Sequence, residues 1–262
     1  MPKCLLVLFL VLTSFSLKAQ TWEFGGAVGG AGYMGDLNPN NPVKISGISF
    51  GGYAQRNFNG YLSLKLNYTY GIIAAADSNS SNQQFRNRNL SFTTTLNEVA
   101  VIGEFNFFNY IPEAGKNKFT PYIFLGIGAV NYNPQTTYQG TRYDLRLYGT
   151  EGEKAPYSST AISIPYGVGV KYNIVGKWTL FAEGGYRNPN TDYLDDVSGV
   201  YATPSSNTAV AKALADRSGE KTGVYIGTPG TQRGDLNPRD TYFFMQVGIS
   251  FTFVTQRCYY ER

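Results

Sequence analysis

The ionisable residues that could act together lie in segments whose side chains alternate between apolar and polar, as they do along β-strands. The polar face of these segments is rich in serine, threonine and glycine, and it also carries four charged residues, Lys65, Lys171, Glu183 and Arg187. We expect Glu98 or Glu104 to join them. Because buried charges must pair, we interpret the set as a salt-bridge network filling the narrow lumen of a closed sheet. An ion or proton path is the alternative.

A second group of carboxylates lies in the run Asp192-Tyr193-Leu194-Asp195-Asp196. Asp192, Asp195 and Asp196 supply oxygen ligands of the kind that Ca²⁺ binds, but their spacing lacks the EF-hand pattern. Aspartates also stabilise turns by hydrogen bonding to nearby backbone. We therefore expect the run to be a structural motif of an outer loop, with no metal or other cofactor.

The composition excludes most catalytic chemistry. The chain has no histidine, which removes Ser-His-Asp catalysis and the commonest metal ligand. Its two cysteines, Cys4 and Cys258, are too few for a thiolate metal site once Cys4 is removed with a leader. The formal charge of +4 falls to +2 without Lys3 and Lys18, which is too small to indicate a nucleic-acid partner. We expect a protein that is not an enzyme.

Residues 1–19 are predicted to be a secretory signal peptide. Lys3 gives a basic start, an apolar run covers Leu5 to Leu12, and cleavage is expected between Ala19 and Gln20. Residues 20–262 then fit a single domain. No later segment is apolar for long enough to form a transmembrane helix.

The segment from Thr241 to Phe253 shows most clearly the kind of β-strand that positions the charged residues. Large apolar side chains, from Phe243 to Phe253, occupy one face, and small polar ones such as Ser250 occupy the other. Its length is what a tilted strand needs to cross a bilayer, about ten residues. The same alternation recurs in seven other segments, which begin near Thr21, Ile45, Leu62, Leu90, Phe119, Ile162 and Trp178.

These segments predict an all-β fold, an eight-stranded antiparallel transmembrane β-barrel of the outer-membrane type with long outer loops. A soluble lipocalin-like barrel or sandwich is the alternative, with its apolar face turned inward. Two segments are irregular. In Leu90 to Phe108 the apolar positions change from even to odd, which a bulge near Asn97 would reconcile. Phe119 to Tyr132 is apolar on both faces, and its register stays undecided.

The predicted connections alternate between short and long, as in outer-membrane barrels with brief periplasmic turns. Both termini are therefore expected in the periplasm, and outer-membrane lipids are expected around the barrel. Gly35-Asp36-Leu37-Asn38-Pro39 recurs as Gly234-Asp235-Leu236-Asn237-Pro238, at the outer ends of the first and last strands. These strands must pair to close the barrel, so we expect the two copies to be neighbours.

Two stretches carry a resemblance to a known family. They are Tyr33-Met34 with the first Gly-Asp-Leu-Asn-Pro copy, and Gly184-Gly185-Tyr186-Arg187 leading into the motif from Thr191 to Gly199. Together they resemble the PorG family, outer-membrane barrels of the Bacteroidota type IX secretion system, whose members take part in protein secretion and gliding motility. The resemblance implies a non-enzymatic barrel that anchors a periplasmic ring, built from a lipoprotein and its partner, to the outer membrane.

A docking surface for such a ring would lie on the predicted periplasmic turns, where Lys116 and Lys118 could meet an acidic partner. A solvated basic turn is the ordinary explanation of these lysines. Two functions of other classes stay open: a small barrel acting as a passive channel or ligand carrier, and a surface adhesin that uses the long outer loops.

Overall fold

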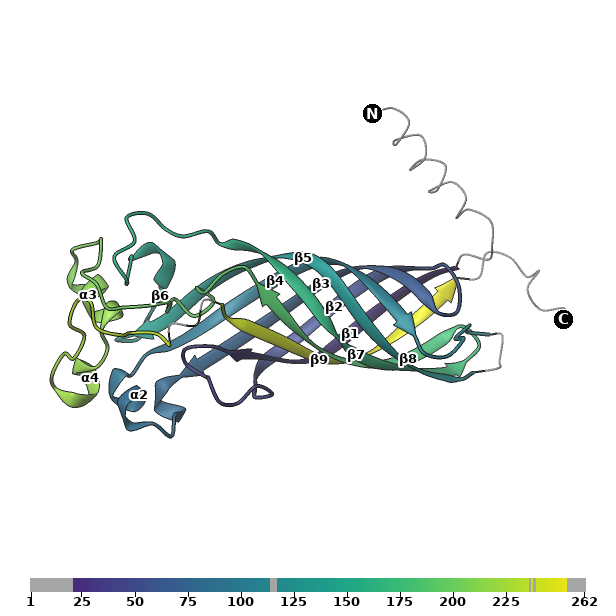
Figure 1. The fold of residues 1–262 in the computed structure, drawn as a ribbon, viewed down its shortest axis with the longest axis horizontal. Coiled ribbons are helices and arrows are strands. Elements are labelled where there is room, and N and C mark those ends of the chain that lie inside the picture. Colours follow the sequence, from purple (N-terminus) through teal and green to yellow (C-terminus); the bar gives the residue numbers. More distant parts are fainter. Residues whose placement is uncertain (1–20, 114–116, 236, 238, 254–262) are drawn as a thin grey trace, which may run out of the picture.

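The computed structural model describes residues 21–113, 117–235, 237 and 239–253. Eight antiparallel strands close into one barrel, in which β9 pairs with β1 and β4 pairs with β5 (Figure 1). The barrel strands are β1 (Thr21–Met34), β2 (Ile45–Asn57), β3 (Leu62–Ala76), β4 (Ser91–Asn106), β5 (Phe119–Tyr138), β7 (Thr160–Val175), β8 (Trp178–Pro189) and β9 (Thr241–Phe253). The predicted eight-stranded barrel is therefore confirmed.

One short strand lies outside the barrel wall. β5 runs six residues beyond its predicted end and folds back on β6 (Thr141–Asp144), so that Tyr138 pairs with Thr141. Both turn residues have positive φ, 49° at Gln139 and 78° at Gly140, as a tight two-residue hairpin turn requires.

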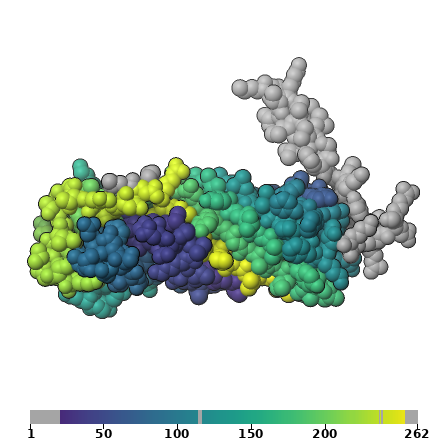
Figure 2. Space-filling view, turned by 60° about the horizontal axis from the view of Figure 1, so that its bottom comes forward, coloured from purple at the N-terminus to yellow at the C-terminus, as the bar shows by residue number. Residues whose placement is uncertain are grey.

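The connections divide between the two ends of the barrel as the sequence predicted. Residues 58–61, 107–118 and 176–177 join strands at one end, which we call the turn end. The connections 35–44, 77–90, 139–159 and 190–240 gather at the other, which we call the loop end; of these, 35–44 has 10 residues and is shorter than the 12-residue connection 107–118 at the turn end. There they carry the helices η1 (Asp77–Asn79), α2 (Gln83–Arg88), η2 (Leu145–Leu147), α3 (Ala209–Ala215) and α4 (Gly219–Thr222), and Figure 2 shows parts of these connections, in purple, blue and yellow-green, at this end of the molecule.

The half of the barrel next to the turn end is apolar outside and polar inside. Along β3 the exposed Leu62, Leu64 and Leu66 alternate with the buried Ser63 and Lys65. The same alternation holds on the neighbouring strands, so the exposed side chains form a continuous apolar belt of the kind that faces lipid. Among the described residues, no helix combines the length and the apolar character needed to span a membrane.

Towards the loop end this polarity inverts. On β4 the outward positions change from Val99 and Val101 to the polar Asn97, Thr95 and Thr93. On the inward face the charged Glu104 and Glu98 lie on the turn side, interleaved with the buried Ile102 and Ala100, and no charged residue follows Glu98 on this face, where Leu96 and Phe92 are buried. Pairing of β4 with β3 and β5 is unbroken, so the predicted bulge near Asn97 is wrong. Even-numbered residues face inward throughout, and only the environment on each side changes.

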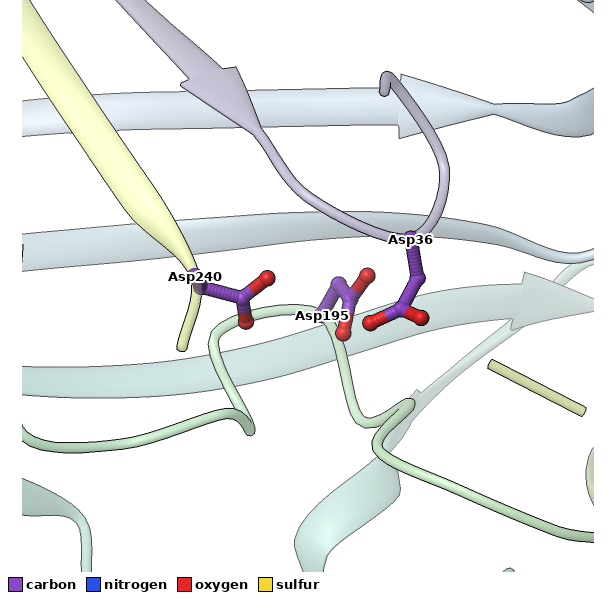
Figure 3. A group of neighbouring side chains, drawn as sticks. All are labelled: Asp36, Asp195 and Asp240. Atoms are coloured by element: carbon purple, nitrogen blue, oxygen red, sulfur yellow. The ribbon is translucent and has the colours of Figure 1, made fainter. Parts of the chain in front are cut away.

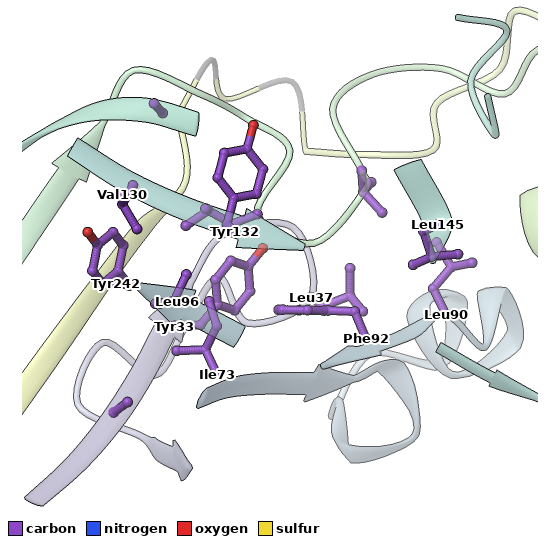
Figure 4. Packing of buried hydrophobic residues seen from close by; sticks show 14 of the residues in the cluster. Tyr33, Leu37, Ile73, Leu90, Phe92, Leu96, Val130, Tyr132, Leu145 and Tyr242 are labelled. Atoms are coloured by element: carbon purple, nitrogen blue, oxygen red, sulfur yellow. The ribbon is translucent and has the colours of Figure 1, made fainter. Parts of the chain in front are cut away.

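The loop-end half therefore has an interior like that of a soluble protein. Inward-facing Ile73, Leu96 and Val130 pack with Leu194 and Leu214 of the connection 190–240 (Figure 4 shows most of this cluster). On β5 the even-numbered side chains, Tyr122 and Val130 among them, face inward, which resolves the register that the sequence left open.

The strands are longer than a membrane requires. β5 has 20 residues, which at the usual rise and tilt span roughly 50 Å along the barrel axis, about twice the height of an apolar belt. The wall therefore continues well beyond the belt on the loop side.

One predicted lipid-facing residue is covered by protein. Phe243 of β9 faces outward but is only 3% exposed. Its ring packs against that of Tyr186, with centroids 5.6 Å apart, and the Tyr186 hydroxyl donates a hydrogen bond to the carbonyl of Pro42 at 3.1 Å. The connection 35–44 thus folds down over the outside of the wall, which alternation along a strand cannot show.

Candidate functional site

The lumen of the turn-end half contains a buried network of ion pairs. Lys65 Nζ lies 2.8 Å from Glu104 Oε1 and 3.1 Å from Glu183 Oε2, and Lys171 Nζ lies 2.5 Å from Glu104 Oε2. The four side chains come from β3, β4, β7 and β8, and each is at most 8% exposed. Strand alternation points all four inward, and barrel closure brings them within reach of one another.

Arg187 does not join this network. Further towards the loop end, its Nε lies 3.5 Å from Glu98 Oε1, and its guanidinium stacks 4.5 Å from the ring centroid of Phe244. Glu98 also accepts hydrogen bonds from Ser163, at 3.2 Å, and from Tyr242. The predicted charged set therefore divides into two layers, with Glu104 in one and Glu98 in the other.

Two tyrosines complete the filling of the lumen, and the sequence did not single them out. The Tyr122 hydroxyl donates to Glu183 at 2.7 Å. Tyr110, from the connection 107–118, is 5% exposed and its hydroxyl lies 2.7 Å from Thr179 Oγ1. Tyr110 thus packs into the turn-end mouth, but because it lies outside the strands, periodicity gives no signal for it.

The run Asp192–Asp196 forms the centre of a plug in the loop-end mouth. Leu194 is fully buried, and its carbonyl accepts a hydrogen bond from Thr94 of β4 at 2.6 Å. The Tyr193 ring stacks on Tyr157 with centroids 4.4 Å apart. We call the connection 190–240 the plug.

The three aspartates of this run do not converge on a common point. Asp192 accepts from Ser198 Oγ at 2.8 Å, and Asp195 accepts from Tyr33. Asp196 has φ +69° and accepts from Thr150 at 2.6 Å and from Tyr157 at 2.7 Å. Because the three carboxylates accept hydrogen bonds from different partners, the run is a hydrogen-bonded loop and not a shared set of cation ligands.

Asp195 instead meets two aspartates that the sequence did not group with it. Asp36, Asp195 and Asp240 are all buried, and one carboxylate oxygen of each lies within 4.8 Å of the others (Figure 3). Such a spacing could share a hard cation, but protein donors already meet each carboxylate. Tyr33 donates to Asp195 and, at 3.0 Å, to Asp240, and the backbone N–H of Leu194 donates to Asp240 at 2.9 Å.

This group, the aspartate junction, joins the connection 35–44 to the plug, of which Asp240 is the last residue before β9. Burial raises the pKa of Asp36 to about 7 and raises the pKa values of Asp195 and Asp240 well above the ordinary value of 3.8. Mutual repulsion of the carboxylates raises the Asp195 and Asp240 pKa values further. The junction therefore favours protonated carboxyl groups, which can share hydrogen bonds.

Two buried arginines connect the remaining loops to the plug. Arg88 pairs with Asp77 at 2.7 Å and donates to the carbonyls of Asp36, at 3.1 Å, and of Arg233. Arg233 pairs with Glu151 at 2.9 Å. These bonds tie the connections 35–44, 77–90 and 139–159 to the plug, so the loop end forms one packed cap.

The predicted docking lysines lie at the turn end. Lys118, immediately before β5, is exposed, and its carbonyl accepts a hydrogen bond from the backbone N–H of Asn173 at 2.7 Å. Lys116 and the predicted signal peptide, residues 1–19, lie outside the described residues.

The closed wall, its apolar belt and its polar, ion-paired lumen define a transmembrane β-barrel of the outer-membrane type. The chain belongs to the family described as "Domain of unknown function (DUF6089)", whose model matches residues 2–210.

Several solved barrels are similar in structure, while no curated protein matches the chain. Neisserial surface protein A has a TM-score of 0.46 and 12% identity, with 90% of this chain and 100% of that one covered. Ail, the attachment invasion locus protein of Yersinia pestis, has a TM-score of 0.38, 11% identity and coverages of 90% and 100%. The outer membrane protein OprG from Pseudomonas aeruginosa has a TM-score of 0.40, 8% identity and coverages of 90% and 97%. These similarities are too distant to indicate a shared function.

Proposed function

We propose that this protein is a non-enzymatic scaffold barrel of the outer membrane that anchors the periplasmic ring of a type IX secretion system. The observation that carries a scaffold role is the filled lumen. Barrels that conduct or carry ligands need an open or enclosed space along the axis. Here the ion-paired network fills the turn-end half and the plug fills the loop-end half.

The link to type IX secretion rests on the resemblance to the PorG family. The two stretches that carry the resemblance meet in space, since Tyr33 donates to Asp195 and Asp36 lies in the same junction. They act together as the seam between wall and plug, which supports treating them as one motif. The ring lipoprotein and its partner are the proposed periplasmic partners.

In this proposal the turn end and both chain termini face the periplasm. The docking surface then consists of the turn-end connections 58–61, 107–118 and 176–177, in which Lys118 is exposed. In this proposal Lys116 and Lys118 meet an acidic surface of the ring, and their charge would mainly speed and orient docking.

Crosslinking in intact envelopes followed by pull-down of the barrel tests the anchor role. Ring proteins should be recovered with the wild type and much less with the double variant K116E/K118E. The matched control, K212E/K221E, makes the same charge change at the loop end and should recover the ring normally. Absence of ring proteins from the wild-type pull-down would refute the anchor role.

A surface adhesin is a second candidate, and one observation favours it. Val224, Tyr225 and Ile226 are 65%, 68% and 45% exposed at the loop end. Hydrogen bonds hold this tip in place, including one from the Ile226 N–H to Ser218 Oγ at 2.9 Å. Because these side chains are exposed, we expect replacing all three by serine to leave the buried part of the plug folded. The adhesin role predicts lost cell binding with normal secretion, whereas the anchor role predicts no change in either.

A further inference from the structure

A groove of about 670 Å³ crosses the loop-end parts of β2, β3, β4, β5 and β6. This volume lies within the usual range for small-molecule sites, about 300–1,000 Å³. Most of its lining side chains are small or carry hydroxyl or amide groups, among them Ser46, Thr93, Gln135 and Thr137. These are the groups that hydrogen-bond to sugars, and the alanines at 74–76 leave room for a bulky ligand.

The charges that line the groove have one sign. Lys44 and Arg142 are its only charged lining residues, both are exposed, and neither forms an ion pair within the described part of the chain. Asp144, two residues beyond Arg142 on β6, is not a lining residue, and it accepts hydrogen bonds from the amides of Asn133 and Gln135. The groove therefore complements an anion that also carries hydroxyl groups.

The height of the groove on the wall identifies the source of such a ligand. The last exposed apolar residue on the outward face of β4 is Val99, and Thr93 lies six positions closer to the loop end. At the rise and tilt of a barrel strand this places the β4 part of the groove about 15 Å beyond the last exposed apolar residue of that strand. Phosphate and sugar groups of outer-leaflet glycolipids lie in this layer, above the hydrocarbon.

We propose that the groove binds the phosphorylated saccharide headgroup of an outer-leaflet glycolipid, with Lys44 and Arg142 contacting phosphate and the hydroxyl and amide side chains contacting sugar. The inference rests on the outer-membrane placement in the proposed function, with the loop end outside the cell. It does not depend on type IX secretion or on the ring.

Binding can be measured on the full-length protein purified in neutral detergent, by native mass spectrometry and by ligand-dependent thermal stabilisation. The probes are diphosphorylated lipid A, the same lipid after dephosphorylation, and inorganic phosphate. Lipid A should bind the wild type, and removal of its phosphates should weaken binding about tenfold or more. The variant K44E/R142E should lose binding to a similar degree.

The control variant K154E/K221E carries the same charge change at exposed loop-end lysines outside the groove, and it should bind lipid A like the wild type. Equal losses in both variants would overturn the proposal, since they would indicate a general charge effect. Equal binding of phosphorylated and dephosphorylated lipid would also overturn it, as would stabilisation by inorganic phosphate equal to that by lipid A. Failure of the ring pull-down would leave this binding result unchanged, so the two proposals fail separately.

Discussion

Asp36 and Asp235 occupy the same position in the two Gly-Asp-Leu-Asn-Pro segments, and they are in contact, because the Asp36 carboxylate accepts a hydrogen bond from the backbone N–H of Asp235. The first segment follows β1 and the second precedes β9, so the contact lies at the seam where the sheet closes. The sequence repeat predicted that the two copies would be neighbours, and the contact between Asp36 and Asp235 confirms it for the described residues.

Loss of the Asp36 acceptor should weaken this seam. In D36A the partly buried Asp235 N–H is left without that partner, and we expect the free energy of unfolding to fall by about 1 kcal/mol. D36N keeps an acceptor oxygen in place and should lose much less. Equilibrium urea unfolding in detergent micelles compares the two variants, and equal losses would contradict a role for this hydrogen bond.

Glu104 should be the most sensitive residue of the lumen. It pairs with both Lys65 and Lys171, so E104A leaves Lys171 with no ion pair among the described residues, and breaking such a buried pair costs about 3–5 kcal/mol. The exposed Lys118 serves as the control, and K118M should change the stability by less than about 0.5 kcal/mol. The stability of both variants can be measured by heat-modifiability on semi-native gels. A stable E104A barrel would show that the network is not needed to fill the lumen.

The packing of the plug in the barrel should be more stable at acidic pH than at alkaline pH. The folded-state pKa of Asp36 is about 7, above its ordinary 3.8, so the folded protein binds the proton more tightly than the unfolded chain does. This contribution to stability is fully present below the ordinary pKa and is lost as the pH rises through about 7. Asp195 and Asp240 act in the same direction.

Hydrogen exchange of the plug backbone, corrected for intrinsic rates and measured with EDTA present, tests this pH dependence. Protection of residues 190–199 should fall about tenfold or more between about pH 5.5 and about pH 8.5. The triple variant D36N/D195N/D240N cannot ionise at these positions and should show a flatter dependence. An unchanged profile in that variant would assign the pH effect to other groups.

Planar-bilayer recordings should show no stable conductance steps from the wild-type protein. L194D places a charge in the fully buried centre of the plug and should displace it, yet we expect this variant to stay closed as well. The network around Glu104 and the Tyr110 contact still occlude the other half. Stable steps from the pure wild type would instead favour the passive channel.

The sequence by itself determined the wall of this barrel. Apolar side chains at every second position, such as Leu62, Leu64 and Leu66, can be buried in lipid only if the polar alternate positions face a closed lumen. That argument predicted the strand number and the inward direction of Lys65, Lys171, Glu183 and Arg187, which the structure shows. The predicted alternation of short and long connections holds except that 107–118, at 12 residues, is longer than 35–44, at 10.

Tertiary structure decided what each face of the wall meets. The shift of apolar positions on β4 looks like a bulge in one strand, but it records a change of surroundings, from lipid outside to the plug inside. Likewise Asp36, Asp195 and Asp240 are separated by 159 and 45 positions along the chain, and only barrel closure and plug insertion bring them together. The alternation of side chains along a strand is a local pattern, so it shows which side chains share a face of the wall. Which solvent, lipid or loop covers that face depends on contacts between distant segments, and these have no local signal.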